Sequence, residues 1–117
     1  MFFKMSFDIL SVAKDNYFIK INPAFTRTLG YDEKDIKKIK FMELIHPNDL
    51  EYAKEVLEKH CQGIPIVIFR ARFLYKDKSC SWIEWSSNID KKLGIFYSVG
   101  RDVSDIVQYE IERNSHK

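Results

Sequence analysis

The chain has 117 residues with a formal net charge of +2, and 45% of its residues are hydrophobic and 15% aromatic. These values predict one folded domain with a single core and exclude a disordered chain. Acidic residues are mixed with the basic ones, and no apolar run reaches the ~18 residues of a membrane span, so neither a nucleic-acid partner nor direct membrane insertion is expected.

Two strands are predicted at the start of the domain, over residues 7–12 and 17–21. Both segments are rich in apolar residues, and the second alternates apolar and polar positions around Lys20. Asp15 and Asn16 between them suit a tight hairpin because both residue types tolerate a positive φ. The domain is therefore expected to begin with a β-hairpin.

Short helices are predicted after the hairpin. Asn22 is a favourable N-cap, Pro23 suits the first helical position, and Gly30 ends this first helix. Asp32 starts a second short helix, and residues 41–45 form a third.

The firmest helix is predicted over residues 48–62. Asn48 is expected to cap it, with Glu51 three residues later to complete a capping box, and Gly63 with Pro65 supplies the stop. Its buried stripe is expected to consist of Leu50, Ala53, Val56 and Leu57.

Three strands are predicted in the second half, over residues 66–75, 81–89 and 95–103, with turns at 76–79 and 90–94. The order is thus two strands, several helices and three strands. Such runs predict an α+β fold, namely a five-stranded antiparallel sheet with short helices packed on one face.

The two cysteines, Cys61 and Cys80, do not form a CxxC motif, so a zinc site is not expected. Their small number favours a reduced, cytoplasmic context. Cys61 is interpreted as a small buried hydrophobic residue.

Several short motifs occur in a definite order along the chain. They are Asn22 before the first helix, Gly30-Tyr31, His46-Pro47-Asn48-Asp49, Lys76-Asp77-Lys78 followed by Trp82, and Arg101-Asp102-Val103-Ser104. In this order and spacing they resemble the PAS sensor family, particularly its subclass with a Trp-containing strand, across residues 7–106. Lys78 departs from the family pattern because a Gly usually stands at this position, which is expected to need a positive φ.

The resemblance implies a sensory or regulatory domain of a longer bacterial signalling protein. This protein would be a sensor histidine kinase of a two-component system or a diguanylate cyclase of a cyclic-dinucleotide pathway. Residues 1–6 would then be the end of an upstream helix or linker, 7–103 the sensor domain, and 104–117 the start of a C-terminal signalling helix. The expected partners are a second copy of the domain and covalently linked effector domains.

The resemblance also implies a sheet that curves over the helices, and alternation then assigns the residues of its inner face. With one residue from the longest helix, the candidate ligand pocket consists of Leu57, Phe69, Ala71, Phe73, Ile83, Trp85, Phe96, Ser98 and Gly100. Two interpretations remain open. The four large aromatic side chains fill the interior themselves, or the interior holds a small apolar ligand.

No cofactor is expected. His60 is the only His on the longest helix, and it lies about two turns later than the axial ligand of the haem-binding relatives that the resemblance suggests. Flavin-binding PAS photoreceptors carry a Cys on a short helix, and residues 32–45 contain none. His46 is expected to bond to backbone near a helix start instead.

The outer face of the sheet is predicted to be apolar, with Leu74, Trp82, Ile95, Tyr97 and Val99 pointing away from the helices. So many apolar residues on one face need a cover. A second subunit is the favoured cover, so that the domain forms a homodimer through this face or through flanking helices. A short helix containing Phe2, Phe3 and Met5 is a second possibility. In a monomer, Arg70, Arg72 and Glu84 would instead shield the aromatic rings.

The tail is predicted to be a signal-transmitting helix, because the apolar residues Val103, Val107 and Ile111 recur every four residues. A solvated tail without a signalling role is the alternative.

The isolated domain is expected to be non-catalytic. His60 and Cys61 are adjacent on a helix, so their side chains diverge by about 100° and cannot act as a nucleophile–base pair. The remaining alternative is a small-molecule enzyme of cone-like α+β fold that uses the apolar interior as its active site.

Overall fold

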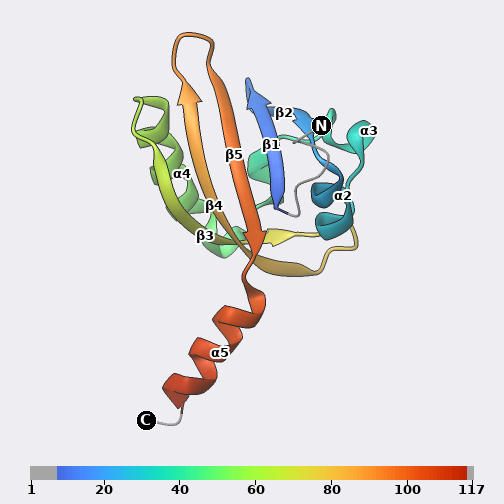
Figure 1. Cartoon of the computed structure of the whole chain (residues 1–117), viewed down its shortest axis with the longest axis vertical. Helices are drawn as coiled ribbons and strands as arrows, with labels where there is room; N and C mark the ends of the chain where they lie inside the picture. Colours follow the sequence, from blue (N-terminus) through green and yellow to red (C-terminus); the bar gives the residue numbers. More distant parts are fainter. Residues whose placement is uncertain (1–7, 116–117) are drawn as a thin grey trace.

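Five strands form one antiparallel sheet in the computed structural model, which describes residues 8–115. Their order across the sheet is β2-β1-β5-β4-β3, so that the last strand along the chain lies at the centre (Figure 1). The strands are β1 (Ile9–Lys14), β2 (Tyr17–Ile21), β3 (Ile66–Leu74), β4 (Cys80–Asp90) and β5 (Ile95–Asp102). The five-stranded antiparallel sheet of the predicted α+β fold is confirmed.

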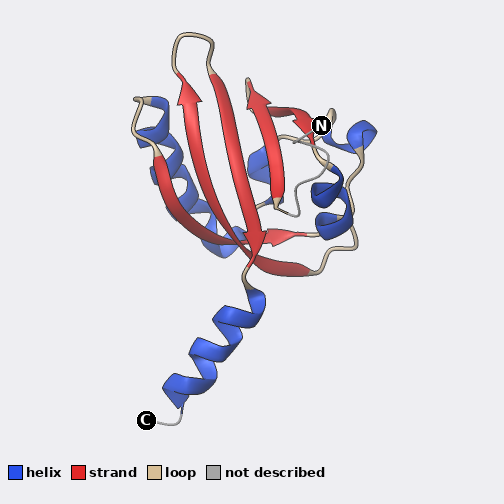
Figure 2. Cartoon of the chain, viewed as in Figure 1, coloured by secondary structure: helices blue, strands red, loops and turns tan. Residues whose placement is uncertain are grey.

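Short helical segments and one longer helix connect β2 to β3. They are α2 (Pro23–Leu29), α3 (Glu33–Ile36), the 3-10 turns η1 (Phe41–Leu44) and η2 (Pro47–Asp49), and α4 (Leu50–Cys61). A last helix, α5 (Ser104–Ser115), follows β5 and projects away from the sheet (Figure 2). Among residues 8–115, no helix has the length and apolar character needed to cross a membrane.

The predicted hairpin between β1 and β2 is confirmed. Asp15 and Asn16 adopt φ values of 53° and 75°, the left-handed conformation that the tight turn requires. β1 extends two residues further than predicted, to Lys14, while Phe7 lies outside the described residues. Lys78 in the β3–β4 turn also has the positive φ that its place in the hairpin predicts, at 77°.

Asn22 ties the start of α2 to the start of β1. Its side-chain oxygen accepts hydrogen bonds from the backbone N–H of Phe25, at 3.1 Å, and of Leu10, at 2.9 Å. Its amide nitrogen donates to the carbonyl oxygen of Asp8 at 2.7 Å. The predicted N-cap is therefore confirmed, and Gly30 ends α2 in the left-handed conformation with φ 88°.

The predicted start of the longest helix is wrong. Residues 47–49 form the separate turn η2, and α4 begins at Leu50, so Asn48 and Glu51 do not form a capping box. His46 caps η2, with Nδ1 accepting a hydrogen bond from the backbone N–H of Asn48 at 3.1 Å. This confirms the backbone role expected for His46.

The carboxylate of Asp49 does not cap α4, because it accepts hydrogen bonds from Arg72 of β3 instead. The backbone N–H of Arg72 donates to it at 2.7 Å, and the guanidinium donates through Nε at 3.0 Å and Nη2 at 2.8 Å. These bonds hold the turn before α4 against the sheet. They also hold the pKa of the Asp49 carboxyl below its usual range, although burial acts in the opposite direction.

We expect Asp49→Asn to lower the free energy of unfolding at pH 7 by about 1.5 kcal/mol, because charge-assisted hydrogen bonds are lost. The pKa of Asp49 is lower in the folded state, so its contribution is present above the ordinary Asp value of about 4 and is lost as the pH falls through the folded value. Urea unfolding between pH 2 and pH 7 should show the two proteins converging in acid. Asp15→Asn, in the exposed hairpin, is the control. A difference that stays constant down to pH 2 would contradict this assignment.

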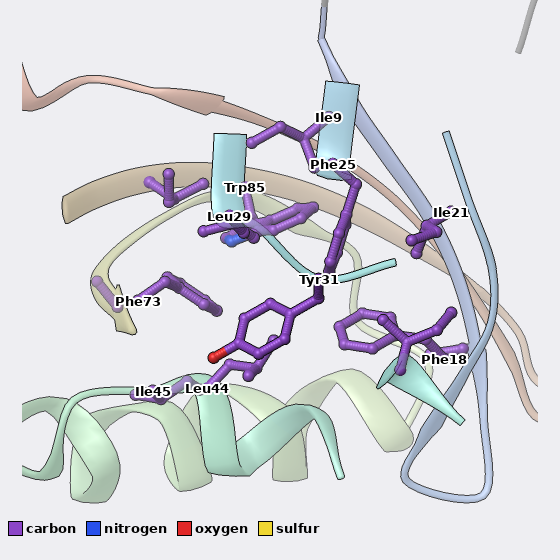
Figure 3. Close-up of a cluster of buried hydrophobic side chains, with 14 of the residues drawn as sticks. Ile9, Phe18, Ile21, Phe25, Leu29, Tyr31, Leu44, Ile45, Phe73 and Trp85 are labelled. Atoms are coloured by element: carbon purple, nitrogen blue, oxygen red, sulfur yellow. The ribbon is translucent and has the colours of Figure 1, made fainter. Parts of the chain in front are cut away.

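The core lies between the sheet and the helical segments, as Figure 3 shows for Trp85 and Ile9 of the strands above Leu44 and Ile45. Aromatic rings meet edge to face or tilted, for example Phe18 with Phe25 at 5.1 Å between ring centres.

The interpretation of Cys61 as a buried residue is wrong, because both Cys61 and Cys80 are exposed free thiols. The preceding residue, His60, is buried on the side of α4 that faces the sheet, and position 61 lies about 100° around the helix, in solvent.

Candidate functional site

A cavity of about 100 Å³ lies between α4 and the inner face of the sheet. Six of the nine predicted pocket residues line it: Leu57, Phe69, Phe73, Trp85, Phe96 and Ser98. Among the lining residues that the sequence did not assign to the pocket are Ser11, Met42, Val56, His60, Ile66 and Ser87. Most of the residues that were predicted for the pocket therefore line a single cavity.

The other three predicted residues are buried but do not line the cavity. Ala71 and Ile83 face each other across β3 and β4, and both are fully covered. Gly100 lies beneath Trp85, since a Cβ at Gly100 would come within 2.7 Å of Cε3 of the indole. The absence of a side chain at Gly100 is therefore what allows Trp85 to lie flat against β5.

A chain of hydrogen bonds forms one polar side of the cavity. The Nδ1 atom of His60 lies 2.7 Å from the carbonyl oxygen of Ile64, and Nε2 lies 2.9 Å from Oγ of Ser87. A carbonyl only accepts, so Nδ1 carries a proton, and in the neutral imidazole Nε2 then accepts from the hydroxyl of Ser87. Ser87 in turn accepts from the hydroxyl of Ser98 at 2.8 Å.

His60 is the pocket residue that sequence reasoning missed, because the sequence analysis considers it only as a haem ligand and as a base beside Cys61. It lies seven positions after Ala53, on the same side of α4 as the predicted stripe, and it is only 1% exposed. Helical periodicity therefore contained the signal that places it in the interior.

The lining of the cavity suits an uncharged molecule. Among the described residues, none of those lining it is Asp, Glu, Lys, Arg or Cys, and both nitrogens of His60 already have partners. A charged group would lose its hydration here without a partner of opposite charge. Within residues 8–115 there is also no cluster of three His, Cys, Asp or Glu side chains that could hold a metal ion.

The outer face of the sheet is partly covered. Leu74, Trp82 and Ile95 are half-buried, whereas Tyr97 and Val99 remain 48% and 44% exposed. The guanidinium carbon of Arg72 lies 5.2 Å from the centre of the Trp82 ring. Arginine thus shields Trp82, but Tyr97 and Val99 stay accessible, and the segment with Phe2, Phe3 and Met5 lies outside the described residues.

The junction between β5 and α5 is held by the carboxylate of Asp102. It accepts hydrogen bonds from the hydroxyl of Tyr75 at 3.0 Å, from the backbone N–H of Ser104 at 2.8 Å, and from the hydroxyl of Ser81 at 3.1 Å. Burial acts to raise the pKa of this carboxyl, but the hydrogen bonds outweigh it and hold the pKa below its usual range. The ends of β3, β4 and β5 therefore meet at the start of α5.

The expected apolar stripe of the C-terminal helix needs one correction. Val103 lies one residue before α5 and is buried in the domain, with 1% exposure, so it anchors the helix and offers no surface. Val107 is half-buried and Ile111 is 53% exposed, so the stripe becomes more accessible away from the sheet. Glu110 contacts Arg70 of β3 at 3.4 Å.

Several solved structures have the same fold. A PAS domain from Colwellia psychrerythraea is 19% identical, covers 88% of this chain and 92% of its own, and has a TM-score of 0.78. A domain of a sensory box sensor histidine kinase/response regulator from Geobacter sulfurreducens is 18% identical, with coverages of 86% and 87% and a TM-score of 0.74.

The N-terminal domain of a diguanylate cyclase with PAS/PAC sensor from Marinobacter aquaeolei is 18% identical, with coverages of 83% and 95% and a TM-score of 0.67. A comparison with curated protein sequences finds no match. The profile of the PAS fold matches residues 18–96, which is more than half of the chain. The chain therefore belongs to the PAS family, whose members are typically non-catalytic sensory modules of signalling proteins.

Proposed function

We propose that this PAS domain is the sensory input of a multidomain bacterial signalling protein, a sensor histidine kinase or a diguanylate cyclase. The similar domains from Geobacter sulfurreducens and Marinobacter aquaeolei belong to proteins of these two kinds. The isolated domain would itself carry out no reaction, and residues 104–117 would lead into the effector. A cytoplasmic setting is supported by the two free thiols, which remain reduced there.

The observation that carries this proposal is the hydrogen-bonded junction at Asp102. Phe96 and Ser98 of β5 line the cavity, and the same strand ends at Asp102, directly before α5. A change in the packing of the cavity thus has a short route along β5 to the start of α5. If this junction has two arrangements, a ligand or a partner that favours one of them shifts the equilibrium between them.

We also propose that the domain acts as a homodimer. The exposed outer residues Tyr97 and Val99 and the accessible side of α5 with Ile111 offer apolar surface to a second copy. In this arrangement the α5 helices of the two copies would pack together, and the displacement of one helix would be passed to the linked effector domains.

Substitution of Val107 by Asp in the full-length parent tests the role of α5. The charge would prevent packing of the helix pair, so we expect effector output to be lost or locked. The melting temperature of the domain should hardly change, because Val107 is only half-buried. Output is measured as kinase or cyclase activity of the parent.

Gln108→Asp is the matched control, since it places the same charge at the neighbouring exposed position on a different side of α5. We expect it to leave output unchanged. Normal output from the Val107→Asp parent would remove α5 from the mechanism.

A further inference from the structure

Three serine residues form a row across the inner face of the sheet. Ser11 of β1 lies opposite Ser98 of β5, and Ser98 lies opposite Ser87 of β4. All three line the cavity. Directly opposed side chains of an antiparallel pair have their Cβ atoms about 5 Å apart, so one oxygen atom can reach two neighbouring hydroxyls of the row. The row therefore gives the otherwise apolar cavity a polar wall.

The hydroxyl of Ser11 is the free member of this row. Ser98 bonds to Ser87 and Ser87 to His60, but Oγ of Ser11 bonds to none of the residues that the structure describes. Among the described residues that are buried or half-buried, Nε1 of Trp85 is the only side-chain nitrogen or oxygen that is both unpartnered and completely covered. Oγ of Ser11 is therefore accessible. Because Ser11 is only 4% exposed and lines the cavity, its accessible oxygen faces the cavity.

The pairing along the row determines what a ligand has to supply. Ser87 donates to Nε2 of the neutral His60 and Ser98 donates to Ser87, so the proton of Ser98 is in use while its oxygen can still accept. Ser11 has both its proton and its oxygen available. A ligand hydroxyl matches this pair, because its oxygen accepts from Ser11 and its proton is donated to Ser98. A carbonyl or ether oxygen only accepts, and it leaves the oxygen of Ser98 without a donor.

This inference deepens the proposed sensory function and rests on it. We propose that the cavity binds a compact, uncharged alcohol, whose hydroxyl accepts from Oγ of Ser11 and donates to Oγ of Ser98. A water molecule would satisfy the same two groups but would leave the apolar part of the cavity, lined by Met42 and Phe73 among others, unfilled. The cavity measures about 100 Å³, and one of about 150 Å³ accepts benzene, so the ligand has about six non-hydrogen atoms or fewer.

The bound alcohol would join β1 to the strand that leads into α5. Ser98 lies four residues before Asp102, whose carboxylate holds the start of α5. An oxygen held between Ser11 and Ser98 favours the arrangement in which the two hydroxyls are both within its reach. Occupancy of the cavity would in this way bias the position of β5 and of the junction that follows it.

Three probes of the same size test the proposal. Cyclopentanol, cyclopentanone and methylcyclopentane have equal numbers of non-hydrogen atoms, and they carry a hydroxyl, a carbonyl oxygen and a methyl group on the same ring. Their dissociation constants are measured by titration of the 15N-labelled chain, followed at the backbone amide signals of β1 and β5. Ratios of these constants are compared between proteins, so the different hydration of the probes cancels.

Ser11→Ala removes the free donor and leaves the bonds from Ser98 to His60 intact. We expect the ratio of the methylcyclopentane constant to the cyclopentanol constant to fall about fivefold, which corresponds to one hydrogen bond. The variant should fold, because the hydroxyl of Ser11 has no partner in the described part of the chain to lose. Ser86→Ala is the control, since Ser86 is an exposed serine of β4 that does not line the cavity, and it should leave the ratio unchanged.

Ser98→Ala tests the second hydrogen bond, which distinguishes an alcohol from a molecule that only accepts. We expect the ratio of the cyclopentanone constant to the cyclopentanol constant to fall about fivefold in this variant. The same ratio should not change in Ser11→Ala, because both probes accept from Ser11. In the wild type, nuclear Overhauser contacts should place the carbon that bears the hydroxyl beside Ser11 and Ser98, and this measurement requires no variant.

The proposal is overturned if none of the probes binds, or if Ser11→Ala leaves the methylcyclopentane-to-cyclopentanol ratio at its wild-type value. An unchanged ketone-to-alcohol ratio in Ser98→Ala also overturns it, since the cavity would then accept any oxygen. None of these results involves α5 or effector output. A parent that responds to Val107→Asp while its domain ignores the probes would retain the sensory function and lose only this ligand. Alcohol binding together with normal output from Val107→Asp would show the reverse.

Discussion

Trp85→Ala is expected to lower the free energy of unfolding by about 3–5 kcal/mol, as truncation of a buried aromatic side chain does. Trp85 is buried on the inner face of β4, its ring centre lies 5.7 Å from that of Phe73, and it covers Gly100. Its removal would enlarge the existing cavity, so the surroundings would have to collapse around a larger void. Urea unfolding at 25 °C measures the loss.

Trp82→Ala is the comparison within the same strand. Trp82 lies on the opposite face, half-buried beneath Arg72, so we expect a loss of only about 1 kcal/mol in folding. If the outer face forms the proposed dimer, self-association should weaken more than folding, which sedimentation velocity detects. Equal losses of stability for the two variants would mean that the inner and outer faces of β4 are assigned wrongly.

Asn22→Ala is expected to cost about 2–4 kcal/mol. The substitution removes the cap of α2, worth about 1 kcal/mol, and also the hydrogen bonds that the Asn22 side chain makes with the N–H of Leu10 and the carbonyl of Asp8. Asn22 itself is almost fully buried. Its replacement therefore affects both the start of α2 and the start of β1. Thermal or urea unfolding measures the combined loss of stability.

Asp32→Ala is the matched control, because Asp32 is the N-cap of another short helix, α3. Asp32 caps α3 through hydrogen bonds from the backbone N–H of Lys34 and Asp35, but this site is exposed and water replaces the lost carboxylate. We expect a loss of at most about 1 kcal/mol there. The assignment of a long-range role to Asn22 would be contradicted if the two substitutions had the same effect.

These caps show what local sequence could predict. Asn22 with Pro23, Gly30, and the Asp15-Asn16 hairpin act within a few residues, and their conformations are as predicted. The start of α4 was mispredicted because its deciding partner is distant in sequence. Asp49 pairs with Arg72 of β3, so a tertiary ion pair replaced the local cap that the pattern around Asn48 suggested.

The candidate site was also predictable only in part, because alternation gives the inner-face residues but not how their side chains pack. Alternation depends on the backbone alone, so it placed Phe69, Phe73 and Trp85 on the inner face. Whether their rings fill the interior depends on how side chains from α4 and η1 meet them, which no pattern along the sequence encodes. The remaining space and the unpartnered Nε1 of Trp85 are properties of that packing, and only the structure reveals them.

The central position of β5 has a consequence for how the chain acquires its fold. During synthesis the β1–β2 and β3–β4 hairpins are complete before β5 leaves the ribosome, and each then presents an open strand edge, β1 and β4 respectively. The sheet joins only when β5 inserts between them, pairing Ile9 near one end of the domain with Gly100 near the other. Such distant pairing slows folding, and a fragment that stops short of β5 would consist of two unjoined, aggregation-prone halves.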